Sequence, residues 1–204
     1  MKHSLEYFSL HYLDMWLKHD RPYHDSINNG TRDEKLNAIK KAVTYYKVAR
    51  NLPKEYDEDI GCDRYGPILK IIDDLVASGF STDTVKSISE VQGKISRAYG
   101  DRMVLSVTTK LLWLKMRDPI IIYDSQARVA LNTPDGDLPS FYAAWRTKYN
   151  AHNKEIAAVC AKLSKVAEYS YDQTIATPSY VRDISAQPWF QERVFDMYLW
   201  HEGL

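Results

Sequence analysis

Asp124 and Arg128 are the residues whose type and spacing most directly suggest chemistry. They lie in DPIIIYDSQARVAL, residues 118–131, where a proline and a short apolar run precede an acid and a helix-compatible segment. The apolar run predicts an extended segment over 119–123, and the residues after Asp124 predict a helix. A carboxylate at such a junction is either an ordinary N-cap or an acid held at the mouth of a site.

Three other side chains that could serve a site also have an ordinary interpretation. Arg128, one helical turn after Asp124, is either a ligand-binding arginine or a surface arginine in an ion pair. Lys110 is either a pocket contact or a solvent-facing lysine on a helix. Trp113 either lines a pocket or packs in the core, which is the commoner place for tryptophan.

Composition is typical of a soluble globular protein. The 204 residues are 45% hydrophobic and 26% charged, which allows one large domain or two small ones. The longest apolar runs are far too short to cross a bilayer, and the first residues lack a signal-peptide core. Two isolated cysteines, Cys62 and Cys160, make no disulfide framework. We therefore expect a cytoplasmic protein with no membrane partner.

Charge is balanced overall but uneven along the chain. The 27 basic and 27 acidic residues give a formal net charge of zero. Residues 32–54 nevertheless hold seven bases against two acids, as do residues 86–117, while residues 55–63 hold five acids. Basic faces of this kind either follow a phosphate backbone or are ordinary solvated helix surfaces.

Hydrophobic periodicity predicts an all-α fold. Helices are expected over 4–19, 32–52, 64–78, about 82–92, 93–98, 104–117, 125–132, 140–150 and 153–170, with Ser81 or Asp83 as a cap and residues 21–30 ending the first helix. A boundary near residue 80 divides an N-terminal helical part, 1–80, from a second part, 81–204.

Motifs for other chemistry are missing from the sequence. The six histidines form no HExxH pair, and HDRPYH at 19–24 is too loosely spaced for a metal site. The sequence has no glycine-rich phosphate loop, GxSxG elbow or Cys/His nucleophile pattern. Asp73 and Asp74 are plain surface acids rather than part of an EF-hand. We expect no metal and no cofactor.

Residues 93–131 together form a helix, a turn at Gly100, a hydrophobic helix, an apolar link and an acid at a helix start. This order resembles the helix-hairpin-helix DNA glycosylase superfamily, in particular its 8-oxoguanine glycosylase-like branch. The resemblance implies a two-lobed helical fold, with the hairpin in 93–117 and DNA as a partner. It also implies a catalytic role for Asp124, substrate contacts from Lys110, Trp113, Tyr123 and Arg128, and nucleic-acid contacts from Arg97, Gly100, Arg102 and Ser106.

An acid at this place has a chemical purpose. Cleavage of an N-glycosidic bond builds positive charge on the sugar, which a fixed carboxylate stabilises. The base must first leave the stack and enter a pocket that aromatic rings commonly line, and Tyr123, Trp113, Tyr45 and Tyr46 are available. The resemblance and this chemistry together predict a DNA base-excision glycosylase.

The sequence departs from the family at two places. The family's hairpin usually reads leucine, proline, glycine, apolar, glycine, whereas ISRAYGDRMV has Gly100 alone, so Arg97 and Arg102 would contact phosphate by charge. Members that also nick the strand use a lysine whose place here falls near Leu105 or Ser106. A monofunctional glycosylase with water as the nucleophile is therefore expected.

Two other functions fit the sequence. The same scaffold could be a non-catalytic module that binds DNA, RNA or a protein, which the missing glycines and lysine favour. The chain could also be a helical protein whose only task is association. Neither the base that is recognised, nor the oligomeric state, nor the role of residues 1–80 follows from the sequence.

Overall fold

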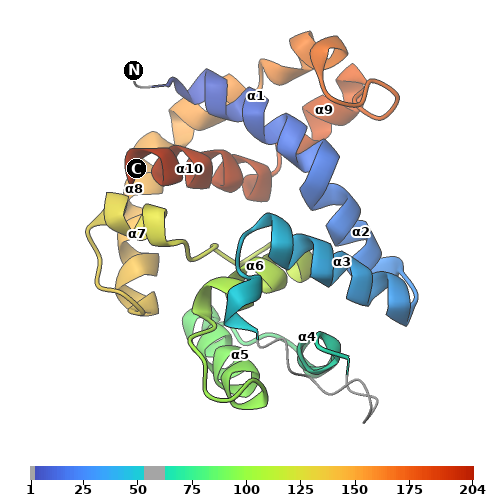
Figure 1. Cartoon of the computed structure of the whole chain (residues 1–204). Coiled ribbons are helices and arrows are strands. Elements are labelled where there is room, and N and C mark those ends of the chain that lie inside the picture. The colour runs from blue at the N-terminus through green and yellow to red at the C-terminus, as the bar shows by residue number, and fades with distance from the viewer. Residues whose placement is uncertain (1–2, 53–62) are drawn as a thin grey trace. The chain divides into compact units, whose positions relative to one another are not determined.

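The structure is a computed structural model that describes residues 3–52 and 63–204, apart from the side chains of 76–78 (Figure 1). Over these residues it contains helices and no strand, so the all-α prediction is confirmed. No helix in the described ranges combines the length and the apolar character needed to span a bilayer. The acidic segment 55–63 lies outside the described residues except for Asp63.

The chain divides into two compact units. Unit 1 comprises residues 1–21 and 124–204, and unit 2 comprises Pro22–Tyr123. This division differs from the boundary near residue 80, because the helices on either side of that residue, Gly66–Ser78 and Thr84–Ala98, pack on each other within unit 2. Asp124 is thus the first residue of the second segment of unit 1.

Unit 1 consists of helices from both ends of the chain. In chain order they are α1 (Leu5–Met15), the π-helical turn η1 (Trp16–Asp20), α7 (Ser125–Leu131), α8 (Leu138–Cys160), the 3-10 helix η4 (Leu163–Tyr169), α9 (Pro178–Ser185) and α10 (Pro188–Glu202). Helix α10 packs on α1, α7 and α8, as Figure 1 shows.

Aromatic rings fill the interior of unit 1. Trp145 and Phe195 meet edge to face with ring centroids 5.1 Å apart, and both are fully buried. Tyr12 packs on Phe190 at 4.8 Å. Each ring removes a large apolar area from water, so these contacts fix α8 and α1 against α10.

Unit 2 contains α2 (Arg21–Asn29, beginning one residue before the unit), α3 (Arg32–Tyr45), the 3-10 turn η2 (Ala49–Asn51), α4 (Gly66–Ser78), α5 (Thr84–Ala98) and α6 (Leu105–Met116). Helix α6 is central, because nine of its twelve residues are buried and both α3 and α5 pack on it. A helix that is buried all round must satisfy its polar side chains inside the fold.

Short polar residues start most of these helices. A side-chain oxygen accepts a hydrogen bond from an amide of the first turn at Ser4, Thr31, Asp83, Asp124, Asp137 and Thr177. Thr31 and Glu34 complete a reciprocal capping box. Asp83 is the cap of α5, as one of the two residues predicted from the sequence.

Several helices differ from the sequence-based expectation, and α9 and α10 lie where no helix range was predicted. Residues 21–29 form α2 rather than a helix end. Helix α5 continues through Gly93, because Val91 and Ile95 are buried on one face and their burial outweighs the roughly 1 kcal/mol cost of a helical glycine. Helix α8 likewise continues past residues 150–153. The segment 119–123, predicted to be extended, belongs to no helix or strand, and Pro119 at its start lies in a turn.

Replacement of Leu112 by alanine tests the central position of α6. Leu112 is fully buried, so Leu112→Ala should lower the free energy of unfolding by about 2–5 kcal/mol through lost burial and a cavity. Urea denaturation followed by circular dichroism measures this. Leu10→Ala in α1, where the side chain is 45% exposed, is the control and should change the free energy by under about 1 kcal/mol. Equal losses in the two variants would contradict a central α6.

Candidate functional site

Asp124 is both a helix cap and a fixed carboxylate. Its side chain accepts a hydrogen bond from the Gln126 amide at 3.0 Å, which confirms the N-cap interpretation. It is half-buried, whereas Ile120–Tyr123 just before it are buried. The Tyr123 amide in unit 2 donates to Thr109 Oγ1 on α6 at 3.0 Å, so the backbone that leads to Asp124 is tied down. A capped acid at the end of an anchored link has a defined orientation.

Arg128 has partners in the loop after its own helix. Its guanidinium donates to the Thr133 carbonyl at 2.9 Å and lies 3.6 Å from Asp135 Oδ1. The side chain is 26% exposed. These contacts agree with the ion-pair interpretation and show that Arg128 holds the 132–135 turn. Its role in substrate binding stays a prediction.

A buried charge network lies in unit 1 around Arg193 on α10. Arg193 donates to Asp196 Oδ2 at 3.0 Å, and its other terminal nitrogen lies 3.6 Å from Asp20 Oδ2. Trp145 donates its indole N–H to Asp196 Oδ1 at 2.8 Å, and the Tyr12 hydroxyl lies 3.4 Å from Asp20 Oδ2. None of these five side chains is more than 9% exposed. The network therefore places two carboxyls around one guanidinium in the core.

Burial governs the protonation of this network. Loss of solvation raises the pKa of Asp196, and the Asp124 charge raises it further, while Arg193 and the Trp145 N–H act in the opposite direction. The pKa of Tyr12 is raised well above its usual 10.0, first by burial and then by the Asp20 charge. The Asp124 charge therefore acts on a second carboxyl in the same unit.

Unit 2 holds the helix hairpin that the sequence predicts. Helix α5 ends at Ala98, Gly100 and Asp101 take left-handed conformations, and α6 begins at Leu105. The Ser96 hydroxyl donates to the Arg102 carbonyl at 2.9 Å and closes the turn. Among the described residues, no side chain caps the first turn of α6.

The predicted nucleic-acid contacts of the hairpin are accessible. Arg97, Gly100 and Arg102 are exposed at the turn and Ser106 is half-buried. The Asn51 side-chain Nδ2 donates to the Met103 carbonyl at 2.9 Å, which ties the turn to the end of η2. Exposed Lys47 precedes η2 in the chain, and exposed Arg50 lies within it. Unit 2 thus carries further exposed bases on a segment bonded to the turn.

Lys110 is buried, so its interpretation as a solvent-facing lysine is wrong. The residue is 4% exposed, and its Nζ donates to the Ser106 hydroxyl at 2.7 Å, one turn toward the start of α6. The side chain is directed inward because α6 is buried on all sides. The amine consequently lies beside Ser106, the second residue of α6.

Three tyrosine rings lead from this amine along the end of α3 to α2, and the first of them is beside the amine. Lys110 Nζ lies 6.0 Å from the centre of the Tyr46 ring, Tyr46 and Tyr45 are 5.3 Å apart, and Tyr45 and Tyr23 are 6.3 Å apart. All three rings are half-buried. The sequence indicated Tyr45 and Tyr46 as available aromatics but gave no signal for Tyr23.

Trp113 and Tyr123 lie inside the fold. Trp113 is 1% exposed and Tyr123 is 5% exposed. The core interpretation of Trp113 is therefore confirmed. Both rings offer almost no surface to a ligand in this conformation, and their roles in substrate binding stay predictions.

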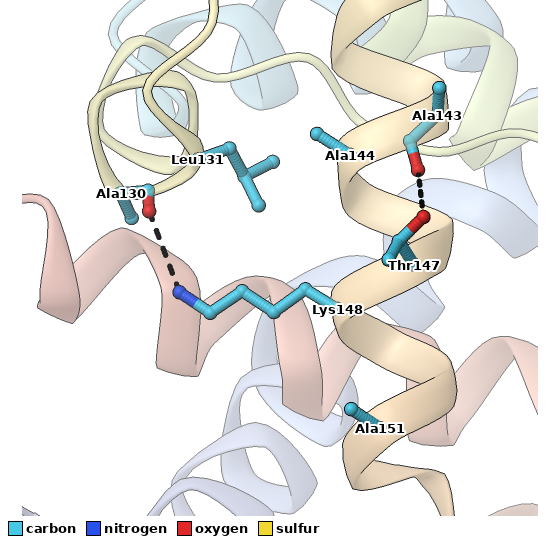
Figure 2. A pocket seen from close by; sticks show the side chains of 7 residues that line it. All are labelled: Ala130, Leu131, Ala143, Ala144, Thr147, Lys148 and Ala151. Carbon is cyan, nitrogen blue, oxygen red and sulfur yellow. Dashed lines mark hydrogen bonds between the residues drawn. The ribbon is translucent and has the colours of Figure 1, made fainter.

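Two of the surface hollows formed by the described residues contain no predicted site residue. One, of about 520 Å³, lies between α7 and α8, where Lys148 reaches across to the Ala130 carbonyl at 3.4 Å (Figure 2). Its other lining residues are Leu131, Ala143, Ala144, Thr147 and Ala151. The second, of about 700 Å³, lies in unit 2 and contains both bases and acids, including Lys35, which pairs with Asp73.

Neither a metal site nor an activated cysteine is found among the described residues. Within residues 3–52 and 63–204, no group of three or more histidine, cysteine or acidic side chains is arranged to hold a metal ion. Burial raises the pKa of the Cys160 thiol to about 12, so this thiol is not an activated nucleophile.

Comparisons of the chain with protein-family models, with curated proteins and with solved structures give no match. The function is therefore inferred from the chemistry and placement of the residues. The structure groups Asp124 and Arg128 in unit 1 and the other seven predicted residues in unit 2.

Sequence analysis missed the residues of the buried network. Arg193 and Asp196 stand three apart within an aromatic stretch, WFQERVFDMYLW. Charged residues at that spacing between aromatics are a signal for a buried pair on the core face of a helix. Asp20 offered no such signal, because it follows a run of charged and polar residues.

The raised pKa of Asp196 predicts a pH-dependent stability. A carboxyl whose pKa is higher in the folded than in the unfolded chain favours folding at acidic pH. The stabilisation from Asp196 decreases as the pH rises from 3.8, the usual pKa of an aspartate, to the raised pKa of the folded chain. At higher pH the stabilisation no longer changes. The free energy of unfolding of the wild type, minus that of Asp196→Asn, should therefore fall over this range. Urea denaturation at a series of pH values measures it, and a difference that rises with pH would contradict the assignment.

Proposed function

We propose that the chain is a DNA base-excision glycosylase, and that Asp124 is its catalytic carboxylate. The observation on which this rests most is the setting of Asp124, an acid oriented by its own helix and preceded by a link that is bonded to the hairpin's second helix. Hydrolysis adds the hydroxide part of a water to the sugar carbon and gives its proton to the departing base. Asp124 would stabilise the positive sugar and orient the water.

The hairpin supports nucleic-acid binding. Arg97 and Arg102 are exposed on either side of a turn at Gly100, and α6 begins beyond it without a side-chain cap. Amides at such a helix start point toward an anion, and the two guanidiniums add charge. Since the whole chain is neutral, attraction of a phosphate backbone would depend on this local surface.

Unit 2 also contains groups suited to an extruded base. The half-buried rings of Tyr45 and Tyr46 offer faces for stacking, and the half-buried Ser106 hydroxyl, held by the buried Lys110 amine, offers a hydrogen bond. Lys110 would act here as a pocket residue, and water would be the nucleophile, which makes the enzyme monofunctional.

A second function, a non-catalytic module that binds DNA, RNA or a protein, is favoured by one observation. The turn between α5 and α6 has a single glycine, Gly100, where a close approach of bare amides to phosphate usually needs more. Such a module would retain salt-dependent binding without turnover.

Replacement of Asp124 by asparagine tests the catalytic role. Asparagine also caps helices well, so Asp124→Asn keeps the cap and removes the charge. Base release from a panel of duplexes, each with one altered base, should fall by about 100-fold or more. Binding to a duplex with a non-hydrolysable abasic-site mimic, followed by fluorescence anisotropy, should persist.

The matched control is Asp137→Asn. Asp137 is the N-cap of α8 in the same unit and accepts from the Ser140 amide at 3.0 Å. Its replacement should leave base release unchanged. Equal activities in the two variants would contradict the role of Asp124, and wild-type binding without release from any duplex would favour the non-catalytic module.

Removal of the hairpin arginines tests the DNA contact. Each guanidinium that neutralises a phosphate contributes about 0.9 to the slope of log affinity against log salt. The double variant Arg97→Ala, Arg102→Ala should therefore bind duplex DNA more weakly and with a shallower slope. Arg182→Ala, an exposed arginine of α9 in unit 1, is the control. Equal slopes for wild type and double variant would contradict a phosphate contact at the hairpin.

A further inference from the structure

Two turns of unit 2 are joined by a hydrogen bond. The first turn is formed by residues 47–51, which follow α3 and include η2, and the second by residues 100–103, between α5 and α6. Asn51 Nδ2 donates to the Met103 carbonyl at 2.9 Å. The Arg64 guanidinium also holds the first turn, because it donates to backbone carbonyls of η2 and of the residue after it. These two bonded turns together are the two-turn surface.

Helices α3 and α5 end in the same way at these turns. In both, the amide of the residue two past the C-cap donates at 2.9 Å to a carbonyl five residues earlier. This is the Schellman motif, in which the residue just past the cap is left-handed and is most often glycine. Gly100 follows that preference, with φ of 74°, whereas Lys47 holds the same conformation with φ of 56°. The turn alone would favour glycine at position 47, so the lysine indicates a role for its side chain.

Exposed bases gather on the two-turn surface. Lys47 and Arg50 are exposed on the first turn and Arg102 on the second, and Arg97 is exposed in the last turn of α5. Asp101 is the one acid in residues 47–51 and 100–103. A surface with this excess of positive charge attracts phosphate groups even though the whole chain is neutral.

Apolar side chains accompany these charges. Tyr46, the C-cap of α3, is half-buried and directly precedes Lys47, and its ring lies 5.3 Å from that of Tyr45. Met103 is 68% exposed on the second turn. Aromatic and apolar groups beside bases can hold the faces of nucleotide bases while the positive charges hold the phosphates.

A single strand offers both kinds of group at once. The bases of a duplex are paired and stacked inside it, whereas those of a single strand expose their faces together with the phosphates. We propose that the two-turn surface binds single-stranded DNA, with phosphates at Lys47, Arg50 and Arg102 and a base against the Tyr46 ring. A base also enters a pocket at least cost from a single strand. The surface stands on the geometry of unit 2, whereas DNA as the strand and a role in base release rest on the proposed function.

Replacement of Lys47 by glycine separates the fold from the contact. Glycine suits the left-handed conformation, so Lys47→Gly should be at least as stable as the wild type in urea denaturation. Its affinity for labelled oligothymidylate, measured by fluorescence anisotropy across a salt series, should fall. The slope of log affinity against log salt should become shallower by about 0.7, the contribution of one phosphate of a single strand. A wild-type slope in this variant would overturn the contact.

Lys154→Ala is the matched control, since it removes one exposed lysine of α8 in unit 1. Its affinity and its salt slope should equal those of the wild type. Equal losses in Lys154→Ala and Lys47→Gly would overturn the two-turn surface, because the effect would then come from net charge alone.

The Tyr46 ring is tested by a pair of variants. Tyr46→Ala should bind oligothymidylate about 5-fold or more weakly with an unchanged salt slope, because a stacking contact and no charge is lost. Tyr46→Phe keeps the ring and should bind as the wild type does. Circular dichroism checks that both variants fold. Equal affinities of the two folded variants would overturn the base contact.

The wild-type chain decides which nucleic acid the surface fits. It should bind oligothymidylate more tightly than the duplex of the same sequence and more tightly than oligouridylate. Tighter binding to the duplex would overturn the single strand as the partner, and tighter binding to oligouridylate would overturn DNA. A chain that binds the single strand and releases no base would refute the proposed function alone. Base release from duplexes without single-strand binding would refute this inference alone.

Discussion

The burial of the Arg193 charge is the constraint on which unit 1 depends. A guanidinium in the core needs compensation from carboxylates and aromatic faces, because loss of its solvation is costly. Asp20 comes from the π-helical turn after α1, Asp196 from α10 itself, and the Tyr12 ring lies 5.4 Å from the guanidinium carbon. Residues near both ends of the chain thus meet at one charge, which fixes how α1 and α10 pack.

A comparable constraint organises unit 2 around α6. Because this helix is buried on all sides, its polar residues have to bond within the unit. Thr109 accepts from the Tyr123 amide, and Lys110 donates back to Ser106. These two bonds anchor the link before Asp124 and place an amine near the start of the helix. The anchored link and the position of this amine are therefore consequences of burying α6.

The two units contribute different chemistry to the proposed function. Unit 2 has the exposed guanidiniums, the tyrosine rings and the buried amine, which are binding groups. Unit 1 has the Asp124 carboxylate, which accepts a hydrogen bond from the first turn of its own helix. Cleavage of an N-glycosidic bond needs an acid whose charge is maintained as the sugar becomes positive.

Local patterns in the sequence determined much of this protein. Apolar periodicity specified the all-α class and the helices α4 and α6, and Gly100 specified the hairpin turn. Short polar residues specified helix starts such as Asp83 and Asp124. These features are readable from the sequence because capping and amphipathicity act over a few residues. The sequence did not determine whether a residue such as Gly93 ends a helix. Val91 and Ile95 of the same helix are buried, and their burial outweighs the local free-energy cost of a helical glycine.

Only the tertiary structure decided which charged side chains are buried and which of them pair. Lys110 is on a helix that could have been exposed, and it is buried because α3 and α5 both cover α6. Asp20, Arg193 and Asp196 are far apart or unremarkable in the sequence, and they meet because α1 and α10 pack together. Solvation and Coulomb energies depend on three-dimensional distance and burial, which a local pattern does not contain.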